Sequence, residues 1–163
     1  MKPIISIIVA IAQNNAIGKD NQLLWHISDD LKRFKRLTLG HTMVMGKRTF
    51  ESLPTRPLPN RRSVVITDIP GEQIEGCVMA YSINDAIEKM EPDAENFIIG
   101  GGSVYRQFLP LADKLYFTIV KKDFEADTFF DPINYEEWDV VYTHECMSDD
   151  LAYTFIDLQR KLI

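Results

Sequence analysis

The feature that most constrains the fold is an apolar run near the start of the chain, Ile4 to Ala12, which reads I-I-S-I-I-V-A-I-A. Apolar and polar residues do not alternate in it, so the strand that it predicts is buried on both faces. Strands of this kind are typical of parallel sheets that are covered by helices. The run is too short for a membrane span or a signal peptide. We therefore expect a central strand in a cytoplasmic protein that does not enter a membrane.

Strands and helices alternate along the first two thirds of the chain. Apolar runs predict strands at 42–45, 63–67, 77–80 and 96–99, and helices are expected at 28–37, 47–53, 82–90 and 103–108. The last third has strand periodicity near 115–120, 138–143 and 151–157. This order favours an α/β fold with right-handed crossovers. We expect a single domain over residues 1–163, with a mainly parallel twisted sheet of about eight strands, antiparallel C-terminal edge strands and about four flanking helices.

Serines precede three of the expected helices and are good N-cap residues. Ser28 and Ser103 each stand at the start of a helical segment. Ser82 stands three residues before Asp85, which is the spacing of a capping box. We expect all three serines to cap their helices.

The composition excludes several classes of function. A net charge of −6 argues against a broad nucleic-acid surface, because phosphate binding needs basic residues. The three histidines, His26, His41 and His144, have no metal-ligand spacing with one another or with Cys77 and Cys146. The sequence also has no G-x-S-x-G nucleophile motif and no complete P-loop. We expect no metal site.

Two acids open the helix expected at 28–37, and they face different surroundings. Asp29 lies within a turn of two cations, Arg33 among them, on a solvated face. Asp30 instead shares a face with apolar residues such as Phe34. A carboxylate against apolar surface is costly without a specific partner, and such groups cluster at functional sites. Asp30 is therefore a candidate functional acid, unless it merely caps backbone amides or pairs with Arg33.

Polar or glycine-rich segments follow four of the expected strands. They are the loop at 13–22, Gly46, Thr67 and the triplet Gly100 to Gly102. In open α/β sheets, ligands bind beyond the carboxyl ends of the strands. The long loop at 13–22 is either a functional lid or a variable surface loop. The four segments together predict a binding site at one edge of the sheet.

Two of these segments are candidates for binding anions. The glycine triplet precedes a helix and is either a phosphate cradle or a tight turn between a strand and a helix. Lys47 and Arg48 stand at a helix start, where cations oppose the helix dipole unless an anion lies beside them, although they are also ordinary surface residues. Arg61 is a candidate for holding a substrate carboxylate, or is likewise surface.

Motifs along nearly the whole chain resemble dihydrofolate reductase of the bacterial chromosomal type. They are I-G at 17–18, L-L-W at 23–25, D-L-x-x-F at 30–34, M-G-K-R-T-F-E-S-L at 45–53, R-P-L-P at 56–59, I-I-G-G-G-x-V-Y at 98–105, Q-F-L-P at 107–110, L-Y-F-T at 115–118 and D-T-x-F at 127–130. Single motifs are weak signals, but the ordered set is specific. The resemblance implies NADPH-dependent reduction of 7,8-dihydrofolate to 5,6,7,8-tetrahydrofolate, which supports one-carbon metabolism, by a cytoplasmic monomer.

The resemblance also implies a substrate site. Asp30 would bind the 2-amino group and the N3 side of the pterin, with support from Thr118, and Arg61 would bind the α-carboxylate of the glutamate tail. Apolar walls and backbone carbonyls would complete the site, whose implied residues are Ile8, Val9, Ala10, Asp30, Leu31, Phe34, Leu53, Leu58, Arg61, Ile99 and Thr118. Water admitted near Leu24 and Trp25 would deliver the proton to N5, so the implied catalytic residues are Asp30, Trp25, Leu24 and Thr118.

The cofactor site implied by the resemblance runs along the other motifs. Its residues are Ala10, Ile17, Gly18, Asn21, Gly46, Lys47, Arg48, Thr49, Ile66, Thr67, Asp68, Ile99, Gly100, Gly101, Gly102, Ser103, Val104 and Tyr105. The loop at 13–27 would close over the nicotinamide, with Asp127 as a latch. The family also implies a cis peptide bond between Gly100 and Gly101.

Three positions depart from the family pattern near the 2′-phosphate of NADPH. Ser103 and Tyr81 stand where some relatives have cations, and Asp68 adds a negative charge. If these changes weaken cofactor discrimination, kcat/KM for NADPH and for NADH should be nearly equal. A large preference for NADPH would show that Lys47 and Arg48 suffice.

Two other functions compete with this interpretation. A reductase of the same fold that acts on a pyrimidine intermediate of flavin synthesis would need a ribose-phosphate site and would not need Asp30 in apolar surroundings. A nucleotide- or pterin-binding module without turnover would be stabilised by ligands but would not consume NADPH in the presence of dihydrofolate.

Overall fold

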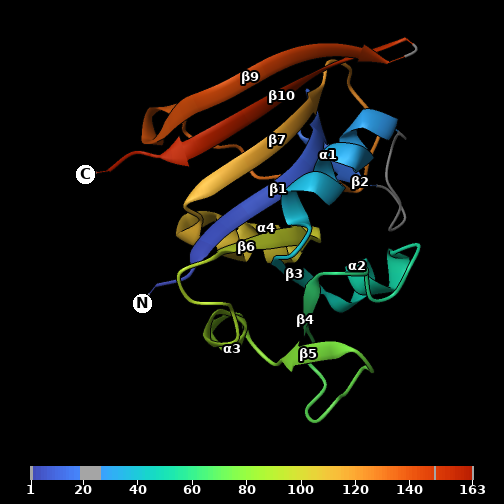
Figure 1. Cartoon of the computed structure of the whole chain (residues 1–163). Helices are drawn as coiled ribbons and strands as arrows, with labels where there is room; N and C mark the ends of the chain where they lie inside the picture. Colours follow the sequence, from blue (N-terminus) through green and yellow to red (C-terminus); the bar gives the residue numbers. More distant parts are fainter. Residues whose placement is uncertain (1, 19–26, 149, 163) are drawn as a thin grey trace.

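A computed structural model describes residues 2–18, 27–148 and 150–162 (Figure 1). The strands are β1 (Ile4–Ala12), β2 (Ala16–Gly18), β3 (Thr42–Gly46), β4 (Arg62–Ile66), β5 (Cys77–Ala80), β6 (Glu95–Gly100), β7 (Lys114–Val120), β8 (Thr128–Phe129), β9 (Trp138–Ser148) and β10 (Leu151–Arg160). The helices are α1 (Ser28–Thr38), α2 (Lys47–Ser52), α3 (Ile83–Glu88) and α4 (Gly102–Phe108), with 3₁₀ turns η1 (Leu109–Leu111) and η2 (Tyr135–Glu137). Every strand and helix expected from the sequence is present.

The main sheet has eight strands in the order β5-β4-β3-β6-β1-β7-β10-β9. The strands from β5 to β7 are parallel to their neighbours, and β10 and β9 add antiparallel pairs at one edge. The predicted fold class is therefore confirmed. Figure 1 shows the long β9–β10 hairpin at one side of the sheet and β5 at the other. The apolar run at Ile4–Ala12 forms β1, between β6 and β7.

Helices cover both faces of the sheet, as the apolar strands require. Successive side chains of a strand point to opposite faces, and β3 shows the result. Met43 and Met45 pack in a cluster with Phe34 of α1 and Phe50 of α2. Val44, which lies between the two methionines, packs on the other face in a cluster with residues of α3 and α4. The two clusters hold α1 and α2 on one side of the sheet and α3 and α4 on the other.

Of the three serines predicted to cap helices, one is an N-cap in the structure. The Ser82 hydroxyl accepts a hydrogen bond from the Asp85 backbone N–H at 3.0 Å and caps α3, as expected. Ser28 and Ser103 lie inside α1 and α4 instead, and the N-cap positions are taken by Ile27 and Gly101 without a side-chain bond. The prediction for these two serines was wrong. In both cases an extended residue before the serine already begins the helix.

The loop predicted at 13–22 is partly regular, because residues Ala16–Gly18 form β2 and pair with β8. The Asp127 backbone N–H donates to the carbonyl of Gly18 at 3.1 Å. The start of this segment is thus attached to the connection between β7 and β9. No helix of the described residues is long and apolar enough to cross a membrane.

Candidate active site

A cleft lies along the carboxyl ends of the parallel strands, where α/β sheets bind their ligands. Its volume is about 2040 Å³. Sites for one small molecule usually measure about 300–1,000 Å³, so this cleft has room for two ligands side by side. Every described residue of the predicted site lines it: Ile8, Val9, Ala10, Ile17, Gly18, Asp30, Leu31, Phe34, Gly46, Lys47, Arg48, Thr49, Leu53, Leu58, Arg61, Ile66, Thr67, Asp68, Ile99, Gly100, Gly101, Gly102, Ser103, Val104, Tyr105 and Thr118.

Three predicted site residues, Asn21, Leu24 and Trp25, lie outside the described residues. Their expected roles at the nicotinamide and in proton delivery stay predictions. Asp127, the expected latch, lines the cleft.

Asp30 lies in the first turn of α1, and its carboxylate points into the cleft beside β7. The Thr118 hydroxyl donates a hydrogen bond of 2.6 Å to Asp30 Oδ1. Burial raises the pKa of Asp30, and the Thr118 hydrogen bond and the charge of Arg33 oppose that rise. Among the described residues, Asp30 has no ion-pair partner. In the part of the chain that the structure describes, its second oxygen accepts no hydrogen bond and can therefore accept one from a ligand.

Arg33 is buried, and the sequence did not predict this. It forms an ion pair with Asp157 of β10, and its guanidinium lies 4.5 Å from the centre of the Phe155 ring. Asp29 is exposed, as expected, but of the two cations near it, Lys32 and Arg33, the second is not its partner. Asp29 instead accepts a hydrogen bond from the Tyr153 hydroxyl at 3.3 Å. The alternative in which Asp30 pairs with Arg33 also fails, because Asp157 takes the guanidinium.

The resemblance implies that backbone carbonyls complete the substrate site, and the carbonyl of Ile8 already has one partner. The Tyr105 hydroxyl donates to the Ile8 carbonyl at 2.9 Å, across the space between α4 and β1. Burial raises the pKa of Tyr105, so this group stays a neutral donor. A carbonyl oxygen accepts two hydrogen bonds, so Ile8 retains one acceptor site for a ligand.

Arg61 lies at the rim of the cleft, half-buried and held by neutral groups. Its Nε donates to the Pro59 carbonyl at 3.0 Å, and one terminal nitrogen donates to the Thr38 hydroxyl at 3.2 Å. Desolvation lowers the pKa of Arg61. The guanidinium makes no ion pair within the described residues. Its fork is thus oriented by the protein and retains donors that match a carboxylate.

The glycine triplet lies where β6 meets α4, and two of its members have separate physical reasons. The peptide bond between Gly100 and Gly101 is cis, as the resemblance implied. Gly100 has a φ of +126°, which favours glycine. A Cβ at Gly102 would lie 2.6 Å from Thr128 Cγ2, so close packing excludes a side chain there. A tight turn therefore explains two of the glycines, and the bare backbone still leaves room for a phosphate.

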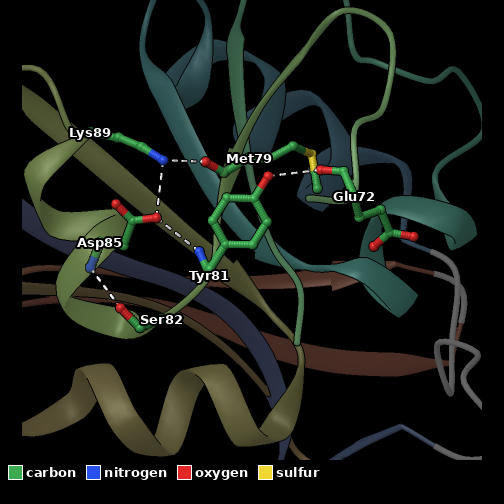
Figure 2. A network of polar contacts seen from close by, with 6 residues as sticks. All are labelled: Glu72, Met79, Tyr81, Ser82, Asp85 and Lys89. Atoms are coloured by element: carbon green, nitrogen blue, oxygen red, sulfur yellow. Dashed lines mark hydrogen bonds and ion pairs between the residues drawn. The ribbon is translucent and has the colours of Figure 1, made fainter. Parts of the chain in front are cut away.

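The polar end of the cleft holds an ion pair that the sequence did not reveal. Lys47 Nζ lies 2.6 Å from Glu72 Oε2, and the Thr67 hydroxyl donates to the other carboxylate oxygen at 2.5 Å. The pair raises the pKa of Lys47 and lowers that of Glu72. Figure 2 shows the support behind it, in which the Tyr81 hydroxyl donates to the Glu72 backbone carbonyl at 2.9 Å. Glu72 stands in a loop without periodicity, so no pattern signalled its partner.

The residues that the structure describes contain no group of three or more metal-ligating side chains. The cleft instead offers a partly buried acid, an oriented guanidinium, a glycine-rich turn and basic side chains. These groups define a class, that of α/β enzymes that bind a dinucleotide and a flat polar substrate at the carboxyl edge of a parallel sheet.

Comparisons with known proteins specify the class further. The sequence model of the dihydrofolate reductase family matches residues 4–160. The dihydrofolate reductase of Bacillus subtilis (strain 168) is 38% identical over 160 residues, which cover 96% of this chain and 95% of that protein. The type 3 dihydrofolate reductase of Salmonella typhimurium is 42% identical over 161 residues, covering 97% and 99%. This chain belongs to the dihydrofolate reductase family.

A solved structure agrees with the sequence relatives. The dihydrofolate reductase from Enterococcus faecalis, complexed with NADP(H) and RAB-propyl, superimposes with a TM-score of 0.88 and is 34% identical. The match covers 96% of this chain and 96% of that chain.

Proposed function

We propose that the residues described above carry out the reaction of the family to which the chain belongs, the NADPH-dependent reduction of 7,8-dihydrofolate to 5,6,7,8-tetrahydrofolate. The observation that carries the assignment of roles is the hydrogen bond between Thr118 and Asp30 inside the cleft. It leaves a partly buried acid that no cation among the described residues pairs with, and a pterin has N–H donors of the kind that such an acid binds.

At this end of the cleft, Asp30 binds the 2-amino group and the N3 side of the pterin, and Thr118 fixes the carboxylate. Apolar side chains from α1 and from the segment after α2 form the walls; they are Leu31, Phe34, Leu53 and Leu58. Arg61 binds the α-carboxylate of the glutamate tail through its oriented fork. These contacts hold the substrate in one orientation, which supplies rate by proximity.

The reduction also needs a proton at N5 of the pterin. Asp30 faces the opposite side of the ring, so its part is an electrostatic field that favours the protonated substrate. Water admitted beside Leu24 and Trp25 delivers the proton. Burial raises the pKa of Asp30, as is common for acidic groups at functional sites.

The rest of the cleft fits NADPH. The cofactor, when bound, supplies the hydride. Ala10, Ile17 and Gly18 line the nicotinamide site, the turn at 100–105 lies along the diphosphate, and Lys47, Arg48 and Thr49 receive the phosphates. A Cβ at Gly100 or Gly101 would lie 3.4 Å from Thr49 Oγ1, so side chains there would fill the space between the turn and α2.

A coupled assay separates the possible functions. The purified chain should consume NADPH, seen as a loss of absorbance at 340 nm, only when dihydrofolate is present. A binding module would be stabilised by both ligands without this loss. The pyrimidine reductase would consume NADPH with its own ribose-phosphate substrate and not with dihydrofolate, and Asp30→Asn would leave its activity intact.

We further propose that the enzyme works as one domain over residues 1–163, as a monomer in the cytoplasm, without nucleic-acid or membrane partners. The net charge of −6 would repel nucleic acid. Sedimentation or light scattering of the purified chain tests the monomer.

A further inference from the structure

The loop between β4 and β5 presents a carboxylate to the polar end of the cleft, and its backbone is held in place. The Glu72 N–H donates to the Ile69 carbonyl at 3.2 Å, and the Glu72 carbonyl accepts from the Tyr81 hydroxyl at 2.9 Å. Figure 2 shows the Glu72 carboxylate extending away from the Tyr81 ring. The side chain is therefore directed by a fixed backbone.

Behind this loop, the start of α3 is fixed by a second set of bonds. Asp85 Oδ2 accepts from the Tyr81 N–H at 2.9 Å and from Lys89 Nζ at 3.0 Å (Figure 2). Lys89 Nζ also donates to the Met79 carbonyl at 2.6 Å. The Tyr81 backbone is thus tied to both β5 and α3. It gives the Tyr81 hydroxyl, and through it the Glu72 loop, a firm support.

Both oxygens of the Glu72 carboxylate engage residues that line the cleft. Oε2 pairs with Lys47 and Oε1 accepts from Thr67. The side chains of Lys47 and Glu72 are 36% and 18% exposed, so an anion can reach the ammonium group, where it meets the charge of Glu72. Glu72 is itself outside the cleft lining, so its effect on a ligand acts through the two residues that it holds.

The surrounding charge favours Glu72 over an incoming anion. Glu51 and Asp68 also act electrostatically on Lys47, and both line the cleft. An anion placed here meets three carboxylates and two cations, Lys47 and Arg48. The negative charges of these carboxylates weaken the binding of a phosphate and have little effect on a neutral ribose hydroxyl.

The position of this cluster in the sheet decides which part of a cofactor would meet it. Thr67 follows β4, and Thr118, beside Asp30, lies on β7, four strands away in the sheet order. At a spacing of about 4.8 Å, this is a distance of about 19 Å. NADPH and NADH differ in one phosphate on the adenosine ribose, at the end of the molecule away from the nicotinamide. The cluster therefore meets the part in which the two cofactors differ.

We propose that Glu72 is a specificity-determining residue, which holds Lys47 and Thr67 and so weakens the preference for a phosphorylated adenosine ribose, allowing NADH to serve beside NADPH. The inference rests on the proposed function, because it needs a dinucleotide in this cleft. Glu72 is not one of the three positions, Asp68, Tyr81 and Ser103, at which the sequence departs from the family pattern near the 2′-phosphate.

Binding of nucleotide fragments tests the role of Glu72 without turnover. Titration calorimetry would compare 2′,5′-ADP with 5′-AMP on the parent, on Glu72→Gln and on the control Glu75→Gln, which removes the same charge from an exposed position in the same loop. We expect Glu72→Gln to tighten 2′,5′-ADP about tenfold and to leave 5′-AMP nearly unchanged, with little effect from the control. The kcat/KM ratio of NADPH to NADH should rise by the same factor.

A double variant that combines Glu72→Gln with Lys47→Met tests whether Glu72 acts through Lys47. If Glu72 acts by holding Lys47, Glu72→Gln gives no gain in a chain that also carries Lys47→Met. Equal tightening of both fragments, no tightening, or a gain that persists without Lys47 would each overturn the proposal while turnover with dihydrofolate persists. Failure of the proposed function looks different, because then no variant consumes NADPH with dihydrofolate. Melting temperatures close to that of the parent confirm that the variants fold.

Discussion

The two ends of the cleft handle a carboxylate in opposite ways. At one end, Asp30 is partly buried and accepts a hydrogen bond from the neutral hydroxyl of Thr118, so its negative charge stays available to a ligand. At the other end, Glu72 binds the ammonium of Lys47 and a hydroxyl, so both charges are largely satisfied within the protein. The difference shows that the role of an acidic residue near a cleft depends on its partner. An acid bonded to a neutral hydroxyl can bind a ligand, whereas an acid paired with a cation changes the ligand affinity of that cation.

The largest effect should come from the end where the carboxylate is unpaired. Asp30→Asn keeps the shape and removes the charge that, in our proposal, orients and polarises the pterin, so kcat/KM for dihydrofolate should fall by about a hundredfold or more. Asp29→Asn, one residue earlier, is the matched control and should stay within about threefold of the parent. Steady-state assays of both variants decide the matter, and equal losses would contradict the contrast between the two acids.

The same variant should be more stable than the parent at neutral pH. Because burial raises the pKa of Asp30 in the folded chain, this group favours folding at low pH, and that contribution is lost as the pH rises through the folded-state pKa. Asp30→Asn does not titrate. Its advantage in the free energy of unfolding should therefore be present at pH 7 and shrink as the pH falls below the ordinary carboxyl range. Urea titrations at several pH values measure it, and a variant less stable at pH 7 would speak against the buried charge.

A smaller loss should follow from removing the neutral partner. Thr118→Val keeps the volume and deletes the donor to Asp30, which raises the pKa of Asp30 further and frees its rotamer. We expect kcat/KM to fall about tenfold and the acidic limb of the pH profile to move to higher pH. Thr154→Val, in the neighbouring strand β10, is a control of the same chemistry. An unmoved pH profile would separate Thr118 from Asp30.

At the paired end, the two cations should differ. Arg48 has no ion pair among the described residues, whereas Lys47 is already held by Glu72. Arg48→Met should therefore raise KM for NADPH about tenfold, and Lys47→Met only about threefold. Steady-state kinetics give KM for NADPH for both variants. A larger rise in KM for Lys47→Met than for Arg48→Met would contradict this prediction.

The smallest effect concerns the support behind the paired end. Ser82→Ala removes the hydroxyl that caps α3 and should lower the free energy of unfolding by about 1 kcal/mol. Turnover with dihydrofolate should not change, because Ser82 does not contact Asp30 or Thr118. A urea titration beside the assay shows whether stability and activity separate as expected.

The sequence was sufficient for the fold and for the position of the site. Apolar runs such as Ile4–Ala12 and the strand-helix order determine the sheet, and glycine or polar segments after four strands locate its ligand edge. The predictions that were wrong concern features that depend on tertiary contacts. Arg33 is buried because Asp157, 124 residues away in the chain, lies on a strand beside α1. Helical spacing cannot indicate such a partner.

Glu72 was missed for a related reason. Its partners Lys47 and Thr67 come from α2 and from the end of β4, and they meet only because a loop without periodic pattern folds back over the sheet edge. The serines at 28 and 103 failed for a local reason, since an extended residue before each one begins the helix. The roles of Asn21, Leu24 and Trp25 stay predictions.

Thr118 is held between two strands from opposite parts of the chain, with Ala10 of β1 on one side and Phe155 of β10 on the other. Translation proceeds from the N-terminus, so Asp30 leaves the ribosome early. Thr118 follows much later, and β10, which pairs with β7, follows after that. A nascent chain therefore completes the Asp30–Thr118 pair within a closed sheet only after β7 and β10 have both been synthesised.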